Sequence, residues 1–156
     1  MNQTRRTLLR ASMAAGVAAV ASAAGLLSPR AVLAAGWPKP AFEAESVDSV
    51  LAALGGAEPN DSQDVKVQAP DIAENGAVVS VTVETSLPNV ESISVVARDN
   101  TRPLAASYLV AEGTDGFISS RIKMRKTSDV IAVVKANGKF YTAKKAVKVT
   151  LGGCGG

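Results

Sequence analysis

The hydrophobic pattern of the chain changes its period near residue 64. Before that point, residues 42–54 place their apolar side chains close to one helical face, and Gly55-Gly56 ends the pattern. Acidic side chains in the first half of this segment suit the positive end of a helix dipole. The pattern therefore predicts one short helix over residues 42–54, which packs on its own domain or docks on a partner.

From residue 64 onward, apolar and polar side chains alternate, as they do in strands with one buried face. Asn75-Gly76 and Asn137-Gly138 are turn signals, and we expect the second to join a hairpin. The run Val130–Val134 is almost entirely apolar, which indicates a central strand. The other expected strands are 64–68, 79–84, 93–97, 106–110, 117–124, 140–143 and 145–151.

About seven short strands, with turn signals every 8–12 residues or so, are typical of an antiparallel β-sandwich. The sequence therefore predicts a mainly β protein with an immunoglobulin-like sandwich and a short N-terminal helix. The Cys…Trp…Cys pattern of antibody domains is absent, so the prediction concerns the architecture alone.

The first residues have the plan of an export signal. Arg5 and Arg6 precede a weakly apolar, alanine-rich run over residues 11–27, and Val32-Leu33-Ala34 offers the small residues that a signal peptidase reads. Paired arginines before such a mild apolar run resemble a Tat signal. The run is too short and too weakly apolar for a good membrane anchor. We expect cleavage after Ala34 and a periplasmic product.

This plan divides the chain into four parts and changes its charge. We expect a signal over 1–34, a lead-in with the helix over 35–63, the sandwich over 64–151 and an arm over 152–156. The full chain has a net charge of +3, but its first 34 residues hold four of the 17 basic residues and no acid. The remainder has 13 bases against 14 acids, a net charge of −1, and gives no support for nucleic-acid binding.

The only cysteine lies in the last five residues, Gly152-Gly153-Cys154-Gly155-Gly156. Glycine has the freest backbone of any residue, so we expect a thin, flexible arm directly after the last strand. A single cysteine in an oxidising compartment cannot form an internal disulfide. It pairs with another molecule, carries a modification or stays reduced for a task. We interpret Cys154 as a carrier thiol on a swinging arm; the alternative is a frayed tail that contains a cysteine.

The residue inventory argues against a self-contained enzyme. The chain has no histidine, which removes Ser-His and Cys-His pairs, and one cysteine without histidine cannot build a tetrahedral zinc site. A thiol–disulfide oxidoreductase would need a second cysteine. We therefore expect no metal, no cofactor and no catalytic residues. Lys144, Lys145 and Lys148 form an exposed strand face or, alternatively, a patch that docks acidic partners or screens an anionic adduct.

The chain resembles the SoxY family, the sulfur-carrier subunits of the periplasmic Sox thiosulfate-oxidising system. The terminal Gly-Gly-Cys-Gly-Gly after Val147-Lys148-Val149-Thr150-Leu151 is the most specific part of this resemblance. Two further stretches are similar to the family: residues 65–83, which include Ala69-Pro70-Asp71-Ile72-Ala73-Glu74-Asn75-Gly76, and Ser128-Asp129-Val130.

The resemblance implies a heterodimer with SoxZ and covalent attachment of sulfur intermediates to Cys154. It also implies three transient partners. The haem-containing SoxAX joins thiosulfate to the thiol, SoxB removes sulfate by hydrolysis and leaves a persulfide, and SoxCD, where present, oxidises that sulfur further. The other hypothesis is a structural exported β-domain that is tethered to another chain by an intermolecular disulfide of Cys154.

Overall fold

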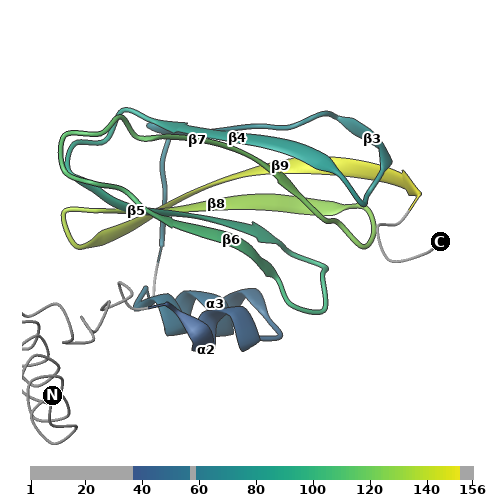
Figure 1. Cartoon of the computed structure of the whole chain (residues 1–156), viewed down its shortest axis with the longest axis horizontal. Coiled ribbons are helices and arrows are strands. Elements are labelled where there is room, and N and C mark those ends of the chain that lie inside the picture. The colour runs from purple at the N-terminus through teal and green to yellow at the C-terminus, as the bar shows by residue number, and fades with distance from the viewer. Residues whose placement is uncertain (1–36, 57–58, 152–156) are drawn as a thin grey trace, which may run out of the picture. The chain divides into compact units, whose positions relative to one another are not determined.

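The computed structural model describes residues 37–56 and 59–151 (Figure 1). The fold described here is that of the described residues within 38–156, which belong to one compact unit. Its core is a two-layer β-sandwich with two short helices on one face. Among the described residues, no helix is long and apolar enough to cross a membrane.

The larger sheet contains six strands in the order β1-β9-β8-β5-β6, and β3 also pairs with β9. Neighbours in the order β9-β8-β5-β6 are antiparallel, whereas β1 and β3 run parallel to β9 along its outer edge. The strands are β1 (Asn60–Asp61), β3 (Ile72–Asn75), β5 (Val90–Ala97), β6 (Leu104–Leu109), β8 (Ser128–Ala136) and β9 (Lys139–Leu151).

The smaller sheet has the order β2-β4-β7 and is antiparallel throughout. Its strands are β2 (Val65–Gln68), β4 (Val79–Thr85) and β7 (Phe117–Ile122). Alternate residues of β4 and of the facing strands β5 and β8 point between the sheets, as the period of two predicts. They form one apolar core, which includes the fully buried Val81, Val83, Ile93, Val95, Val130 and Val134.

Two helices, α2 (Lys39–Glu43) and α3 (Val47–Leu54), cover the outer face of the larger sheet (Figure 1). Their buried residues pack on outward-facing side chains of that sheet and form a second cluster: Ala41, Val50 and Leu51 with Val96, Leu104, Ile131 and Val133. The predicted helical face therefore docks on its own domain.

The single helix predicted over residues 42–54 is wrong in its extent. Ala44 and Ser46 have extended backbones, and Ser46 begins a new helix, with its hydroxyl accepting a hydrogen bond from the backbone N–H of Ser49 at 3.2 Å. Gly55 ends α3 with φ 89°, as the glycine signal predicted.

The predicted β-sandwich is confirmed, with differences at its edges. β8 lies inside the larger sheet, and Asn137 and Gly138, with φ of 51° and 72°, form the turn between β8 and β9. The expected strands 140–143 and 145–151 are one continuous strand, β9. The strands β1 and β3 were not predicted.

Candidate functional site

The described chain ends at Leu151, the last residue of β9, whose side chain is 64% exposed. Cys154 and its glycines Gly152, Gly153, Gly155 and Gly156 lie outside the described residues, as do the signal arginines Arg5 and Arg6 and the expected cleavage residue Ala34. The site is therefore built from the end of β9, residues 149–151, and from the contacts that hold it. We call residues 149–151 the arm root.

On its outer edge, the arm root is paired with β3. Ala73 lies opposite Val149 and Asn75 lies opposite Leu151 in a parallel register. The N–H of Gly76 donates to the Leu151 carbonyl at 2.7 Å, so the pairing continues to the last described residue. The Thr150 hydroxyl adds a hydrogen bond of 2.9 Å to the Glu74 carbonyl.

On its inner edge, the arm root has no β8 partner, because the pairing of β8 with β9 ends at Ser128 and Val147. The side chain of Thr127 replaces that partner. Its hydroxyl oxygen accepts from the N–H of Val149 at 2.9 Å, and the hydroxyl donates to the Val149 carbonyl at 3.2 Å. Both edges of β9 are thus hydrogen-bonded close to its end, which fixes where the terminal segment begins.

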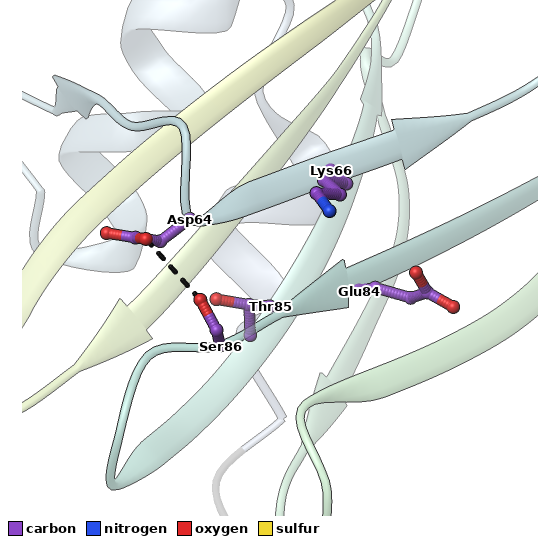
Figure 2. A pocket seen from close by; sticks show the side chains of 5 residues that line it. All are labelled: Asp64, Lys66, Glu84, Thr85 and Ser86. Atoms are coloured by element: carbon purple, nitrogen blue, oxygen red, sulfur yellow. Dashed lines mark hydrogen bonds between the residues drawn. The ribbon is translucent and has the colours of Figure 1, made fainter.

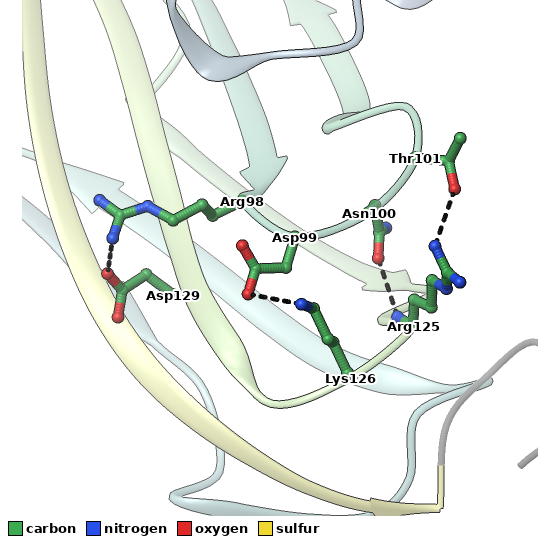
Figure 3. Close-up of polar contacts among 7 residues, drawn as sticks. All are labelled: Arg98, Asp99, Asn100, Thr101, Arg125, Lys126 and Asp129. Atoms are coloured by element: carbon green, nitrogen blue, oxygen red, sulfur yellow. Dashed lines mark hydrogen bonds and ion pairs between the residues drawn. The ribbon is translucent and has the colours of Figure 1, made fainter.

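Further hydrogen bonds, made by Met124 and Asn100, fix the segment beside Gly76. The N–H of Met124, which is fully buried, donates to the Gly76 carbonyl at 2.7 Å. Asn100 holds the residues on either side of Met124. Its amide nitrogen donates to the Lys123 carbonyl at 2.7 Å, and its amide oxygen accepts from the N–H of Arg125 at 2.8 Å, the second of which Figure 3 shows.

Ion pairs around this end of the sandwich leave some bases without a carboxylate. Figure 3 shows Arg98 paired with Asp129 at 2.9 Å and Lys126 with Asp99 at 3.5 Å. The guanidinium of Arg125 instead reaches the Thr101 hydroxyl at 3.5 Å.

Lys144, Lys145 and Lys148 of β9 do not form one patch. Lys145 binds Asp71 at 2.5 Å, and this hydrogen bond and the lysine charge hold the pKa of the Asp71 carboxyl below its usual range. Lys144 and Lys148 are exposed and alternate with Lys145 along β9, so they face the other side of the sheet. The interpretation of these residues as an exposed strand face fits Lys144 and Lys148.

The far end of the sandwich carries a small open hollow lined by Asp64, Lys66, Glu84, Thr85 and Ser86 (Figure 2). The Ser86 hydroxyl donates to Asp64 at 3.4 Å, and Lys66 lies opposite Glu84 in the β2–β4 register. Within residues 37–56 and 59–151, no group of three or more His, Cys, Asp or Glu side chains could hold a metal ion.

Sequence reasoning singled out the thiol but missed the residues that hold the arm root. Thr127 looks like an ordinary residue before a strand, and its role depends on a β9 residue that is 22 positions away. Asn75-Gly76 was recognised as a turn, but no local pattern indicates that Gly76 binds Leu151.

The fold and the arm root define a β-sandwich protein with a single cysteine in a glycine-rich segment directly after its last strand. The chain belongs to the SoxY family: the family of the sulfur oxidation protein SoxY matches residues 50–154, and the match ends at Cys154. The resemblance seen in the sequence is therefore confirmed.

A solved structure agrees with this assignment. The sulfur carrier protein SoxY from Chlorobium limicola f thiosulfatophilum is 41% identical, with a TM-score of 0.62 over 73% of this chain and 100% of that one. A superoxide reductase (neelaredoxin) from Ignicoccus hospitalis is 18% identical, with a TM-score of 0.49 over 56% of this chain and 80% of that one, which is too distant to bear on function. No curated protein matches the chain.

Proposed function

We propose that this protein is a covalent carrier of sulfur-oxidation intermediates, which are attached to the thiol of Cys154 and presented to partner enzymes. The observation that carries this proposal is the arm root. A strand that is hydrogen-bonded on its outer edge up to Leu151 and on its inner edge up to Val149 leads directly into the glycine-flanked cysteine, within a family match that extends to residue 154. The carrier itself catalyses no step.

The chemistry divides between the carrier and its partners. Loading joins the Cys154 sulfur to the outer sulfur of thiosulfate, which forms an S–S bond, releases the thiol proton and passes two electrons to the haem-containing SoxAX. Hydrolysis by SoxB then consumes one water, releases sulfate and two protons, and leaves a persulfide on Cys154. Where SoxCD is present, it oxidises that remaining sulfur.

The proposed setting is the periplasm. Arg5 and Arg6 support export by a Tat-type signal that is removed after Ala34, and export in a folded state would allow SoxZ to cross already bound. The proposal assigns residues 35–63 to the lead-in and helices, residues 64–151 to the sandwich and residues 152–156 to the arm.

Replacing the thiol tests the function directly. In protein purified from cells that oxidise thiosulfate, we expect intact mass to show added sulfur or a thiosulfate-derived group on the terminal peptide. Cys154→Ser should abolish that adduct completely, with an unchanged unfolding transition, because the side chain lies beyond the last strand. Wild-type protein treated with a thiol reductant serves as the unmodified control.

The opposite result is as informative. A bare thiol under these conditions, or only a disulfide between Cys154 and another polypeptide, would reject the carrier function. The second of these outcomes would instead establish the structural tether.

A further inference from the structure

Three bases follow one another at the end of β7 and in the segment directly after it, beside the arm root. Arg121, Lys123 and Arg125 alternate with Ile122 and Met124, which are buried. All three bases are exposed, and none makes an ion pair with a carboxylate among the residues that the structure describes. We call Arg121, Lys123 and Arg125 the basic row.

The backbone of the basic row is held firmly next to the arm root. Asn100 binds the backbone of both Lys123 and Arg125, and Figure 3 shows its contact with Arg125. Between these residues, Met124 donates to the Gly76 carbonyl, and the Gly76 N–H donates to the Leu151 carbonyl, each at 2.7 Å. Two hydrogen bonds thus link the backbone of the basic row to the residue from which the terminal segment starts.

The neighbours of Arg121 are hydroxyl groups. Arg121 lies opposite Ser80 in the β4–β7 register, and the two line a shallow hollow with Ser119 and Ser120. The Ser119 hydroxyl already bonds with that of Thr82, and the Ser120 hydroxyl accepts from Tyr108, whereas the Ser80 hydroxyl makes no side-chain hydrogen bond within the described residues. Arg121 and Ser80 together suit an oxyanion, because an arginine fork pairs with two oxygens and a hydroxyl can donate to a third. No carboxylate lines this hollow.

The positive charge is local to one end of the sandwich. At the far end of the same sheet, Glu84 lies opposite Phe117, and the loop before Phe117 carries Glu112 and Asp115. Near the arm root, the acids Asp71, Asp99 and Asp129 are neutralised by ion pairs, which leaves Glu74 as the acid without an ion pair among the described residues there. The chain beyond the export signal is slightly negative, so the basic row opposes its net charge.

We infer that the basic row collects and binds sulfur oxyanions of the thiosulfate class beside Cys154, both as free substrate and as the sulfonate end of the adduct. This inference rests on the proposed function and names the surface of the carrier that recognises the substrate's charge. Cys154 is three residues beyond Leu151, roughly 10 Å of chain at most, which is about one Debye length at 0.1 M salt. A row of positive charges next to the point where the terminal segment starts raises the local concentration of an anion there.

The test compares two reagents that react with the same thiol. Dithiobis(nitrobenzoate) is a dianionic aromatic disulfide and dithiodipyridine is a neutral one; each forms a mixed disulfide with Cys154 and releases one aromatic thiol. In Lys123→Glu/Arg125→Glu, we expect the ratio of the anionic rate to the neutral rate to fall about tenfold at low salt. The ratio cancels any change in the pKa of the Cys154 thiol, because that change affects both reagents.

Lys139→Glu provides the matched control. Lys139 is also exposed and free of ion pairs among the described residues, but it lies at the far end, as the first residue of β9 after the β8–β9 turn. Its charge reversal should leave the ratio within about twofold of the wild-type value, and the difference between the two variants should vanish at high salt. An unchanged ratio in the double variant, with normal reactivity toward the neutral reagent, would overturn the inference.

Loading of thiosulfate by the partner enzymes separates the remaining outcomes. If the reagent ratio is unchanged in the double variant but loading slows, the basic row docks an acidic protein surface and the oxyanion inference is rejected. If the wild-type thiol never acquires a thiosulfate-derived group, the proposed function fails, while the reagent ratio still decides whether the basic row attracts anions.

Discussion

At the scale of single residues, Thr127 holds the inner edge of the arm root through its side chain alone. Its hydroxyl satisfies both the N–H and the C=O of Val149 at the point where β8 no longer pairs with β9. Thr127→Val keeps the shape of the side chain but removes both hydrogen bonds. We expect the free energy of local opening at the end of β9 to fall by about 1 kcal/mol, with no change elsewhere in the sheet.

Amide hydrogen exchange checks this prediction. The N–H of Val149 should exchange about fivefold faster in the variant, which corresponds to that energy. Thr114→Val is the control, because the Thr114 side chain is exposed in a loop and has no side-chain hydrogen bond within the described part of the chain. Unchanged protection of Val149 would show that β3 alone secures the strand.

A second residue-scale prediction concerns acid stability. The Lys135 ammonium, bonded to Glu91 at 2.8 Å, and the N–H of Gly138 at 2.6 Å hold the pKa of the Glu91 carboxyl below its usual value. A group with a lowered folded-state pKa stabilises the fold above its unfolded pKa, and this stability is lost as the pH falls through the folded pKa.

The stability of Glu91→Gln should therefore be lower than that of the wild type at neutral pH, and the difference should shrink below about pH 4.5. Denaturant unfolding at a series of pH values measures this difference. Glu112→Gln, in an exposed loop without an ion pair among described residues, serves as the control with no such trend. A gap that widens in acid would contradict the role given to Lys135.

At the scale of elements, α2 and α3 are integral to the fold. Val50 is fully buried in the cluster between α3 and the outer face of the larger sheet. Val50→Ala removes two methyl groups there and should cost about 2 kcal/mol of unfolding free energy. Val78→Ala makes the same change at a side chain that is 58% exposed and should cost less than about 0.5 kcal/mol.

Chemical denaturation of both variants decides whether the helices unfold with the sheets. A single transition with a lowered midpoint for Val50→Ala is expected. A separate early transition in Val50→Ala, with the main transition unchanged, would mean that α2 and α3 are only loosely attached.

An element can be predicted from the sequence when residues close together in the chain determine it, and not when a distant segment does. The turn at Asn137 and Gly138 needs two residues with positive φ, which an Asn-Gly pair supplies locally. The centrality of β8 follows from its run of apolar residues. In contrast, β3 shows little alternation and exists because Ala73 pairs with Val149, far along the chain. Pairing at that distance leaves no local pattern.

At the scale of the whole molecule, the sandwich and its family were predictable, but the arm root was not. Alternation and turns are distributed along the chain, and Cys154 stands out because the chain has one cysteine, flanked by glycines. The arm root is held by Gly76 and Thr127, which only the folded topology brings to the end of β9. The proposed role of the basic row could not be predicted from the sequence either, because it depends on the end of the sandwich at which these residues lie.

Under the proposed carrier function, the hydrogen bond between Gly76 and Leu151 also limits how deep the active site of a partner enzyme can lie. The tether starts at a fixed point on the surface of the sandwich, and from there the cysteine reaches no further than roughly 10 Å. A catalytic centre deeper than that below its own surface stays out of reach unless the body of the carrier enters as well. The fixed end of β9 would therefore restrict the partners of the proposed carrier to enzymes whose active sites lie close to their surface.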